Sequence, residues 1–291
     1  MTSKPHLPPF PFEALDRLLP LAFAEDEGSG DITSLAVIDE NARGRAGLLC
    51  KQAGIAAGLP AVERIFRFRG LEAECIPFRA DGDTVSPGET LMEIRGVLRG
   101  LLLCERILLN VLQRLSGIAT AAAEHVKALE GSNTRLLDTR KTPPGWRELD
   151  KYAVAAGGGQ NHRHGLYDQV LIKDNHAEAC GSVRAAVDRA HARYGGAHLV
   201  EAEVRSPEEL ATLFDAPVDI VLLDNMDDKA LAEAAALARA RAPKLKLEAS
   251  GNMDVQRLRR IRHIGLDFIS VGALTHSPRA MDISMEIESH G

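Results

Sequence analysis

The sequence contains few aromatic residues and no excess of positive charge. Aromatic side chains make up 4% of its 291 residues, which leaves few surfaces on which nucleic-acid bases could stack. The formal net charge of −6 has the same sign as a phosphate backbone. Both features argue against non-specific nucleic-acid binding, so a cluster of cations in this chain is expected to form a local pocket.

Cysteine pairs and uninterrupted apolar runs are also missing. The richest apolar segment, residues 97–115, contains four charged side chains and is unsuited to a lipid-facing helix. The first residues, MTSKPHLPPFPF, lack the basic and apolar regions of a secretory leader. We therefore expect a cytoplasmic location without membrane contact. The cysteines show no CxxC spacing, which favours buried, reduced thiols over disulfides or a zinc site: Cys50, Cys75, Cys104 and Cys180.

The first region of the chain mixes helix and strand patterns. Hydrophobic residues make up 45% of the sequence, enough for a sizeable core in one large domain or two smaller ones. From residue 100 the apolar spacing is helical, with an interruption predicted at Gly117 and an end at Gly131. An α+β sandwich is expected before that point, with helices at 12–25 and 61–67 and strands within 43–58 and 73–94.

From residue 135 onward, strand-like and helix-like segments alternate. Such alternation predicts a parallel sheet, either an α/β barrel or a doubly wound sheet. A barrel is favoured because each strand ends on a polar residue or glycine, whereas a doubly wound sheet would gather its site at one switch point. Strands are expected at 135–140, 169–175, 199–204, 220–225, 246–251 and 268–272, and helices at 147–155, 177–194, 207–214, 228–240 and 254–263.

The stretch from Asp138 to His176 contains most of the candidate site. Its glycine run, residues 157–159, could let backbone N–H groups approach an anion. Any single cation in the stretch could equally be a surface charge. Together, however, strand ends and a glycine loop that all carry cations predict a pocket for a small polyanion with carboxylate and phosphate groups. The cationic candidates are Arg140, Lys141, His162, Arg163 and Lys173.

Two acidic residues and two loops complete the candidate set. Glu203 and Asp224 end two strands and could hold Mg²⁺, offset positive charge on a substrate, or pair with the pocket cations. Glu201 lies on the same strand face as Glu203 and competes for that role. SGN at 250–252 and VGALTHS at 271–277 follow the last two strands, where backbone N–H groups often hold a 5′-phosphate.

A series of ordered motifs resembles the quinolinate phosphoribosyltransferase family, with Pro143 in place of a threonine in the family's TRKTTPG pattern. The resemblance implies an α/β fold: an N-terminal α/β sandwich domain, residues 1–117, to which a tail at 276–291 returns, and an incomplete, seven-stranded α/β barrel at 118–275. The motifs are EDEGSGDIT, ERILLNVLQRLSGIAT, DTRKTPPGWR, GGGQNHR, LIKDNH, EAEV, LLDN, SGN and SVGALTHS.

The resemblance also implies an activity. It predicts a pentosyltransferase that moves a phosphoribosyl group from phosphoribosyl pyrophosphate to quinolinate with loss of CO₂, giving nicotinate mononucleotide and pyrophosphate in NAD biosynthesis. Mg²⁺ is expected with the phosphoribosyl donor, and no tightly bound organic cofactor. Arg106, which by itself suggests a surface charge, would enter the site of a neighbouring subunit in a homodimer or hexamer.

The same resemblance distributes roles among the candidates. Arg106, Arg140, Arg163 and Lys173 correspond to residues that hold the two carboxylates of quinolinate, with Thr139 among the substrate-binding residues. Lys141 and His162 correspond to groups near the ribose and pyrophosphate, and Glu203 and Asp224 to acids facing the ribose hydroxyls and Mg²⁺. The 5′-phosphate site would contain Ser250, Gly251, Asn252, Val271, Gly272 and Ala273, with His276 as a further candidate.

Other functions remain open at this point. Within the same fold, the acceptor could be nicotinate itself, or the protein could be the paralogue linked to molybdate-transport operons. A Schiff-base aldolase would use Lys173 or Lys141 as its nucleophile. A non-catalytic binding protein would show affinity without turnover. The excess of arginines favours an acceptor with two carboxylates.

Overall fold

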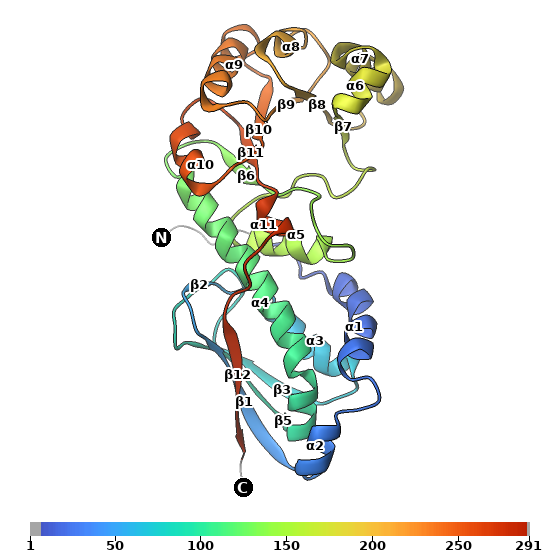
Figure 1. Cartoon of the computed structure of the whole chain (residues 1–291), viewed down its shortest axis with the longest axis vertical. Helices are drawn as coiled ribbons and strands as arrows, with labels where there is room; N and C mark the ends of the chain where they lie inside the picture. Colours follow the sequence, from blue (N-terminus) through green and yellow to red (C-terminus); the bar gives the residue numbers. More distant parts are fainter. Residues whose placement is uncertain (1–6, 290–291) are drawn as a thin grey trace. The chain divides into compact units, whose positions relative to one another are not determined.

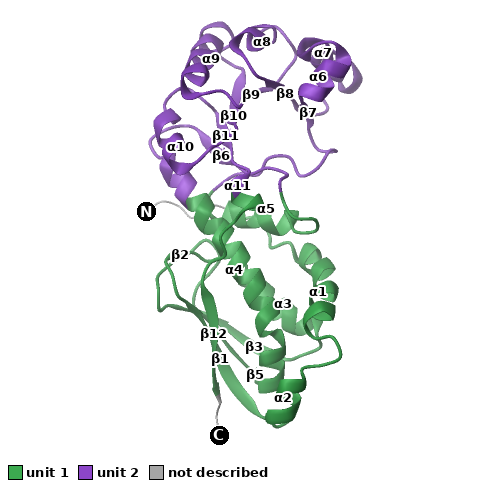
Figure 2. Ribbon diagram, in the orientation of Figure 1, with its two compact units in different colours: residues 1–123, 142–158, 274–291 green, residues 124–141, 159–273 purple. Residues whose placement is uncertain are grey.

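The computed structural model describes residues 7–289 and divides into two compact units (Figure 2). Unit 1 contains Met1–Ala123, Thr142–Gly158 and Leu274–Gly291, and unit 2 contains Glu124–Lys141 and Gly159–Ala273. The sequence-based division differs mainly at residues 142–158, which it assigned to the barrel and which belong to unit 1. Residues 1–6, where the leader was judged absent, and 290–291, the end of the predicted tail, lie outside the described part.

Unit 1 contains an antiparallel sheet with the strand order β12-β1-β5-β3. Alternate residues of β1 are buried, as expected for a strand with one face on the core. β12 pairs with β1 from Gly44↔Ser289 to Cys50↔Ile283, so the end of the chain joins the first strand (Figure 1). The strands are β1 (Arg43–Cys50), β3 (Ala73–Pro77), β5 (Thr90–Val97) and β12 (Ile283–Ser289), with β2 (Gly54–Ile55) and β4 (Thr84–Val85) forming a separate pair.

The longest of the described helices, α4 (Leu98–Ala128), belongs to unit 1 as far as Ala123 and lies across this sheet (Figure 1). The predicted interruption at Gly117 was wrong, because α4 runs through it without a break. A Cβ at Gly117 would lie 2.1 Å from the carbonyl oxygen of Arg279, so glycine here permits close packing of another chain segment. The other helices of the unit are α1 (Phe12–Asp26), α2 (Ile32–Val37), α3 (Pro60–Phe68) and α5 (Arg147–Ala156).

Unit 2 is an incomplete α/β barrel of parallel strands. Among the described residues its sheet has six strands in the order β6-β11-β10-β9-β8-β7, so the last strand pairs with the first and the barrel is open between β6 and β7. In place of the seventh strand that the resemblance implied, Gln160 makes a single parallel bridge to Leu137. The strands are β6 (Arg135–Leu137), β7 (Val170–Ile172), β8 (Val200–Val204), β9 (Ile220–Asp224), β10 (Lys246–Ser250) and β11 (Phe268–Ser270).

Helices lie on the outer side of these strands (Figure 1). The helix predicted at 177–194 is divided in two, because Gly181 adopts φ +93° and ends the first half. Ser182 then caps the second half by accepting a hydrogen bond from the N–H of Ala185 at 3.1 Å. These helices are α6 (Asp174–Cys180), α7 (Val183–Tyr194), α8 (Pro207–Ala211), α9 (Asp228–Arg241) and α10 (Val255–Ile261). The short helix α11 (Ala273–His276) follows and, apart from Ala273, belongs to unit 1.

The described residues include no helix that is long and apolar enough to cross a membrane. Of the four free cysteines, Cys50 and Cys104 are buried, while Cys75 and Cys180 are half-buried. Burial raises the pKa of Cys104 to about 12 and that of Cys75 to about 11, so both thiols are protonated at neutral pH.

Candidate active site

A pocket of about 680 Å³ lies at the carboxyl ends of the barrel strands in unit 2. The strands of a parallel barrel all end on the same rim, which brings together residues that are far apart in the sequence. Of the residues selected from the sequence, ten line this pocket: Thr139, Arg140, Lys141, His162, Arg163, Lys173, Glu203, Asp224, Ser250 and Gly251.

Other lining residues were missed in the sequence. Leu222 and Glu248 lie two positions before Asp224 and Ser250 on β9 and β10, and Leu171 on β7 lies two positions before Lys173, which directly follows that strand. Side chains two apart on a strand point to the same face, so these three form a layer below the rim. That alternation was the signal that could have found them. The missed residues are Leu166, Leu171, Asp174, His176, Leu222, Asn225, Glu248 and Ser270.

The pocket brings like-charged guanidinium groups together. Burial, and then the positive charge of Arg140, lowers the pKa of Arg163. The side chain of Arg163 is held by a hydrogen bond that its Nη1 donates to the carbonyl oxygen of Gln169 at 3.1 Å. Lys173 adds a third cation at the start of α6. An anion bound among these groups would relieve their repulsion and accept charge-assisted hydrogen bonds.

His162 is fixed in one orientation beneath these cations. Its backbone N–H donates to Oδ1 of Asp138 at 2.8 Å, and Nδ2 of Asn161 donates to Oδ2 of the same carboxylate at 2.7 Å. Nδ1 of the ring accepts a hydrogen bond from the backbone N–H of Arg163 at 2.6 Å. The ring proton therefore lies on Nε2, which is 3.0 Å from Oε2 of Glu201.

Two carboxylates face the pocket from neighbouring strands. Glu203 is the last residue of β8 that faces the pocket, and Asp224 is the last residue of the neighbouring strand β9. Burial, and then the negative charge of Asp224, raises the pKa of Glu203. Glu201 does not line the pocket; it is fully buried and accepts a hydrogen bond from Nε2 of Gln169 at 2.6 Å. The rim therefore presents a pair of acidic groups that favours a cation between them.

The predicted phosphate site is only partly present in this pocket. Ser250 and Gly251 line it, and Gly251 adopts φ +96° with a Cβ position 2.2 Å from Oδ1 of Asn225, so no other residue fits. The N–H of Val271 is already used in a hydrogen bond to the carbonyl oxygen of Leu137 at 3.0 Å. The predicted residues that do not line the pocket are Asn252, Val271, Gly272, Ala273 and His276, the last of which belongs to unit 1.

Two further predicted features do not line the pocket. The expected anion loop at residues 157–159 was wrong, because the N–H groups of Gly157 and Gly158 donate to the carbonyl oxygens of Ala153 and Ala155 and end α5. A Cβ at Gly157 would also lie 2.2 Å from the carbonyl oxygen of Ala119, so the glycine serves close packing. Arg106 is exposed on α4 and does not line the pocket.

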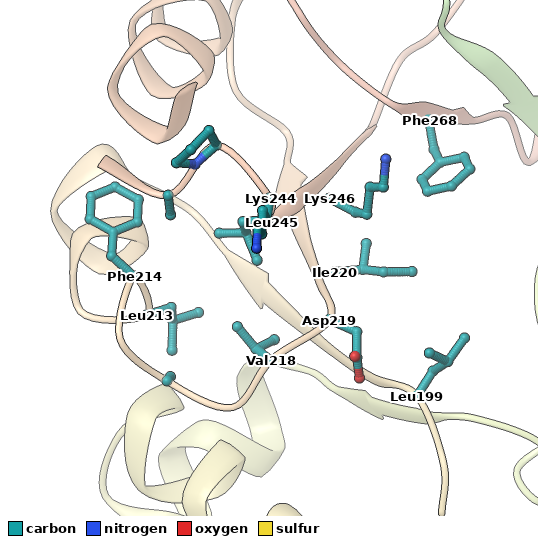
Figure 3. Close-up of a pocket in the computed structure, with 13 residues that line it drawn as sticks. Leu199, Leu213, Phe214, Val218, Asp219, Ile220, Lys244, Leu245, Lys246 and Phe268 are labelled. Atoms are coloured by element: carbon teal, nitrogen blue, oxygen red, sulfur yellow. The ribbon is translucent and has the colours of Figure 1, made fainter. Parts of the chain in front are cut away.

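A second cavity of unit 2, of about 740 Å³, lies at the opposite, amino ends of the same strands (Figure 3). Apolar side chains such as Phe214, Ile220 and Phe268 form much of its lining, and none of the residues selected from the sequence belongs to it. Its acidic group, Asp219, accepts a hydrogen bond from the N–H of Val200 at 2.7 Å. Because the two cavities are similar in size, their side-chain chemistry decides which one is the candidate active site.

Both halves of the chain match family models. Residues 31–116 match the N-terminal domain of quinolinate phosphoribosyl transferase, and residues 118–286 match its C-terminal domain. The chain belongs to the quinolinate phosphoribosyl transferase family. All ten lining residues selected from the sequence fall within the C-terminal match.

Relatives in this family match the chain over most of its length. It is 40% identical over 273 residues to a probable nicotinate-nucleotide pyrophosphorylase (carboxylating) of Bacillus subtilis, covering 94% of this chain and 93% of that protein. Quinolinate phosphoribosyltransferase (decarboxylating) 2b, mitochondrial, of Nicotiana tabacum is 37% identical, with 97% and 84% covered. The crystal structure of NadC from Streptococcus pyogenes has a TM-score of 0.90 at 39% identity, covering 97% and 98%.

Proposed function

We propose that the protein transfers the phosphoribosyl group of phosphoribosyl pyrophosphate to quinolinate and releases CO₂ and pyrophosphate, leaving nicotinate mononucleotide. The activity makes it a pentosyltransferase of NAD biosynthesis. This proposal rests on one observation. A single pocket is lined by three cationic and two acidic residues: Arg140, Arg163, Lys173, Glu203 and Asp224. The names carboxylating and decarboxylating describe this reaction written in its two directions.

The cationic part of the pocket suits the acceptor substrate. Quinolinate carries two neighbouring carboxylates, and each charge-assisted hydrogen bond to them contributes about 1.5–3 kcal/mol. Arg140 and Arg163 hold these carboxylates together with Lys173. Burial, and then the charge of Arg140, disfavours the charged form of Arg163 and lowers its pKa; a bound dianion offsets both effects, so the pocket favours a dicarboxylate over a monocarboxylate.

The acidic part of the pocket suits the phosphoribosyl donor. Glu203 and Asp224 accept hydrogen bonds from the ribose hydroxyls, and Ser250 and Gly251 receive the 5′-phosphate. The ring nitrogen of quinolinate then attacks C1′ as pyrophosphate leaves, with positive charge developing on the ribose. The nearby carboxylates stabilise that charge, while Lys141 and His162 attract the leaving pyrophosphate. Positioning and electrostatic stabilisation provide the rate increase.

The donor set also fits Mg²⁺. Glu203 and Asp224 offer carboxylate oxygens, which this hard cation prefers. Burial, and then the charge of Asp224, raises the pKa of Glu203, and a bound cation would offset both effects. When bound, Mg²⁺ would neutralise negative charge on pyrophosphate. The proposal includes both direct contact of the two carboxylates with the metal and contact through the substrate.

Loss of CO₂ follows from the chemistry of the acceptor. Once its nitrogen is bonded to C1′, the pyridinium ring accepts the electron pair left at C2 when the carboxylate leaves. Tight binding of that carboxylate would stabilise the ground state and slow its loss. The arginines therefore position the substrate, and the positive charge of the ring drives decarboxylation.

We also propose that the protein forms a homodimer or larger assembly, in which Arg106 of one subunit completes the pocket of its partner. Arg106 is exposed on α4, and α2 in the same unit exposes 78% of Ile32, 58% of Leu35 and 71% of Val37, as interface surfaces do. Arg106→Ala and Arg140→Ala should each be nearly inactive alone. Mixing the two variants should restore activity, because one pocket of each mixed pair is intact. Absence of any recovery would contradict the shared site.

Location and further partners stay predictions within this proposal. We expect a cytoplasmic protein that acts on small molecules and binds neither nucleic acid nor membranes. The −6 net charge supports the first of these absences.

Calorimetric titration tests the choice of acceptor. Because quinolinate has one carboxylate more than nicotinate, it should bind at least about 10-fold more tightly. The preference should disappear in Arg163→Ala. Equal affinity for the two acids in the unmodified protein would refute the dicarboxylate pocket and favour a related enzyme for nicotinate.

A further inference from the structure

A cluster of one histidine and two glutamates lies at the base of the pocket. Side-chain atoms of His162, Glu201 and Glu248 all lie within 4.8 Å of one another. Nε2 of His162 is 3.0 Å from Oε2 of Glu201 and 3.8 Å from Oε2 of Glu248. Glu201 is fully buried and Glu248 is 1% exposed, yet Glu248 still lines the pocket. The proposed roles of the substrate-binding residues leave Glu248 unused.

The hydrogen bonds within the cluster are unequal. Oε2 of Glu201 receives hydrogen bonds from Gln169 and from Nε2 of His162, whose ring proton is fixed there by the contact at Nδ1. Each glutamate keeps one buried oxygen without a hydrogen-bond partner among the described residues, Oε1 of Glu201 and Oε2 of Glu248. Glu201 has two partners on its other oxygen, whereas Glu248 has a hydrogen bond with Ser270. Because an ionised carboxylate is destabilised more than a protonated one where fewer donors stabilise it, the proton in this cluster is favoured on Glu248.

The surrounding charges agree with this assignment. Burial, and then the negative charge of Glu201, raises the pKa of Glu248 to about 8, and Asp138 acts in the same direction. His162 and a hydrogen bond from Ser270 act against the rise and are outweighed. Glu248 therefore carries a proton at neutral pH, on the floor of the pocket in which a pyridine ring would lie.

The proposed reaction needs such a proton. Loss of CO₂ breaks the bond between C2 and its carboxylate and leaves the electron pair on C2. The product carries hydrogen at that carbon, so one proton must be delivered to it inside the pocket. A buried, protonated carboxylic acid is a suitable donor, because its pKa lies near the operating pH.

We propose that Glu248 is a catalytic acid that protonates C2 of the pyridinium ring as CO₂ leaves. The O–H bond of its carboxyl group breaks, the proton bonds to C2, and Glu248 is left as a carboxylate. Solvent returns the proton after the product leaves. This inference rests on the proposed function and assigns one further step of it to a named residue.

The test is a single-turnover comparison of the full-length protein and Glu248→Gln, with quinolinate, phosphoribosyl pyrophosphate and Mg²⁺. The amide keeps the size of the side chain and removes its acidic proton. The rate of pyrophosphate release should change by less than about 3-fold. Nicotinate mononucleotide should form at least about 100-fold more slowly. A mononucleotide that retains both carboxylates should accumulate and be seen by mass spectrometry.

The pH dependence gives a second readout. In the unmodified protein, the rate of the decarboxylation step should fall as pH rises through about 8, because Glu248 loses its proton there. That fall should be absent in Glu248→Gln. If the amide variant does not fold, Glu248→Asp, which keeps the acid on a shorter side chain, should show the same separation of the two steps to a smaller degree.

Other outcomes overturn the inference. Formation of nicotinate mononucleotide at the unmodified rate in Glu248→Gln would show that another group delivers the proton. An equal loss of pyrophosphate release and decarboxylation, together with weaker quinolinate binding, would make Glu248 a structural residue. Neither result resembles failure of the proposed function itself, in which the unmodified protein would release no pyrophosphate from these substrates.

Discussion

The two ends of the barrel contain cavities of similar volume, about 680 Å³ at the carboxyl end and about 740 Å³ at the amino end, with opposite electrostatics. At the carboxyl end, like charges meet: the charge of Arg140 helps to lower the pKa of Arg163, and that of Asp224 helps to raise the pKa of Glu203. Repulsion of this kind lowers stability and marks a site that a ligand completes.

At the amino end, opposite charges are paired. Asp267 lies 2.6 Å from Nη2 of Arg239 and 2.7 Å from Nζ of Lys246, and it accepts a hydrogen bond from the N–H of Leu247 at 2.9 Å. Burial favours a higher pKa for Asp267, but these partners outweigh it and lower the pKa. The amino end therefore stabilises the barrel, and the carboxyl end is the proposed place of the chemistry.

The largest expected effect is that of removing a cation from the carboxyl end. Arg140→Ala should raise the KM for quinolinate at least about 100-fold, because it removes charge-assisted hydrogen bonds to the substrate. Lys246→Ala is the matched control, since it removes a cation from the amino end and should leave KM unchanged. Steady-state kinetics of both variants measure the two KM values. An unchanged KM in Arg140→Ala would contradict the proposed role of the carboxyl end.

A matched pair of glycines sharpens the comparison. Gly251 at the carboxyl end and Gly265 at the amino end both have positive φ, +96° and +93°. Gly251→Ala must also displace the side chain of Asn225, so the KM for phosphoribosyl pyrophosphate should rise about 10-fold. Gly265→Ala should lower the free energy of unfolding by about 1 kcal/mol and leave the kinetics unchanged. Equal kinetic effects of the two substitutions would argue against a phosphate site at Gly251.

The smallest kinetic effect is expected at Asp267. Asp267→Asn should lower the free energy of unfolding by about 2 kcal/mol at pH 7 and leave kcat and KM unchanged. Because the folded-state pKa of Asp267 is lowered, its stabilisation is complete above the ordinary value of 3.8 and is lost as pH falls through the folded-state pKa. Urea unfolding should show a smaller difference in the free energy of unfolding between the two proteins in acid than at pH 7. A difference that stayed constant would contradict the ionic role.

The sequence predicted the rim of the site better than its floor. Strand ends are visible because a buried apolar run stops at a charge, as at Lys173 and Asp224. Glu248 lies inside such a run, where the pattern shows only that it is buried, and its distance to His162 depends on three-dimensional contacts between separate strands and loops. Alternation along β10 would have placed Glu248 on the same face as Ser250.

Glycines were the other source of error. Gly117 was interpreted as a helix break, and residues 157–159 as an anion loop, yet Gly117 and Gly157 permit a backbone carbonyl to approach closely. A sequence shows that a glycine is present but not which neighbour excludes a side chain. The seventh barrel strand that the resemblance implied is not found among the described residues, where Gln160 makes a single bridge to Leu137.

The most direct test of the central claim is turnover of the purified protein with quinolinate, phosphoribosyl pyrophosphate and Mg²⁺, with the quinolinate labelled in its C2 carboxylate and nicotinate supplied in a parallel reaction. The account predicts equal molar amounts of CO₂ and nicotinate mononucleotide from quinolinate and no comparable reaction with nicotinate. Mononucleotide formed from nicotinate alone, without CO₂, would contradict the dicarboxylate pocket at the carboxyl end of the barrel.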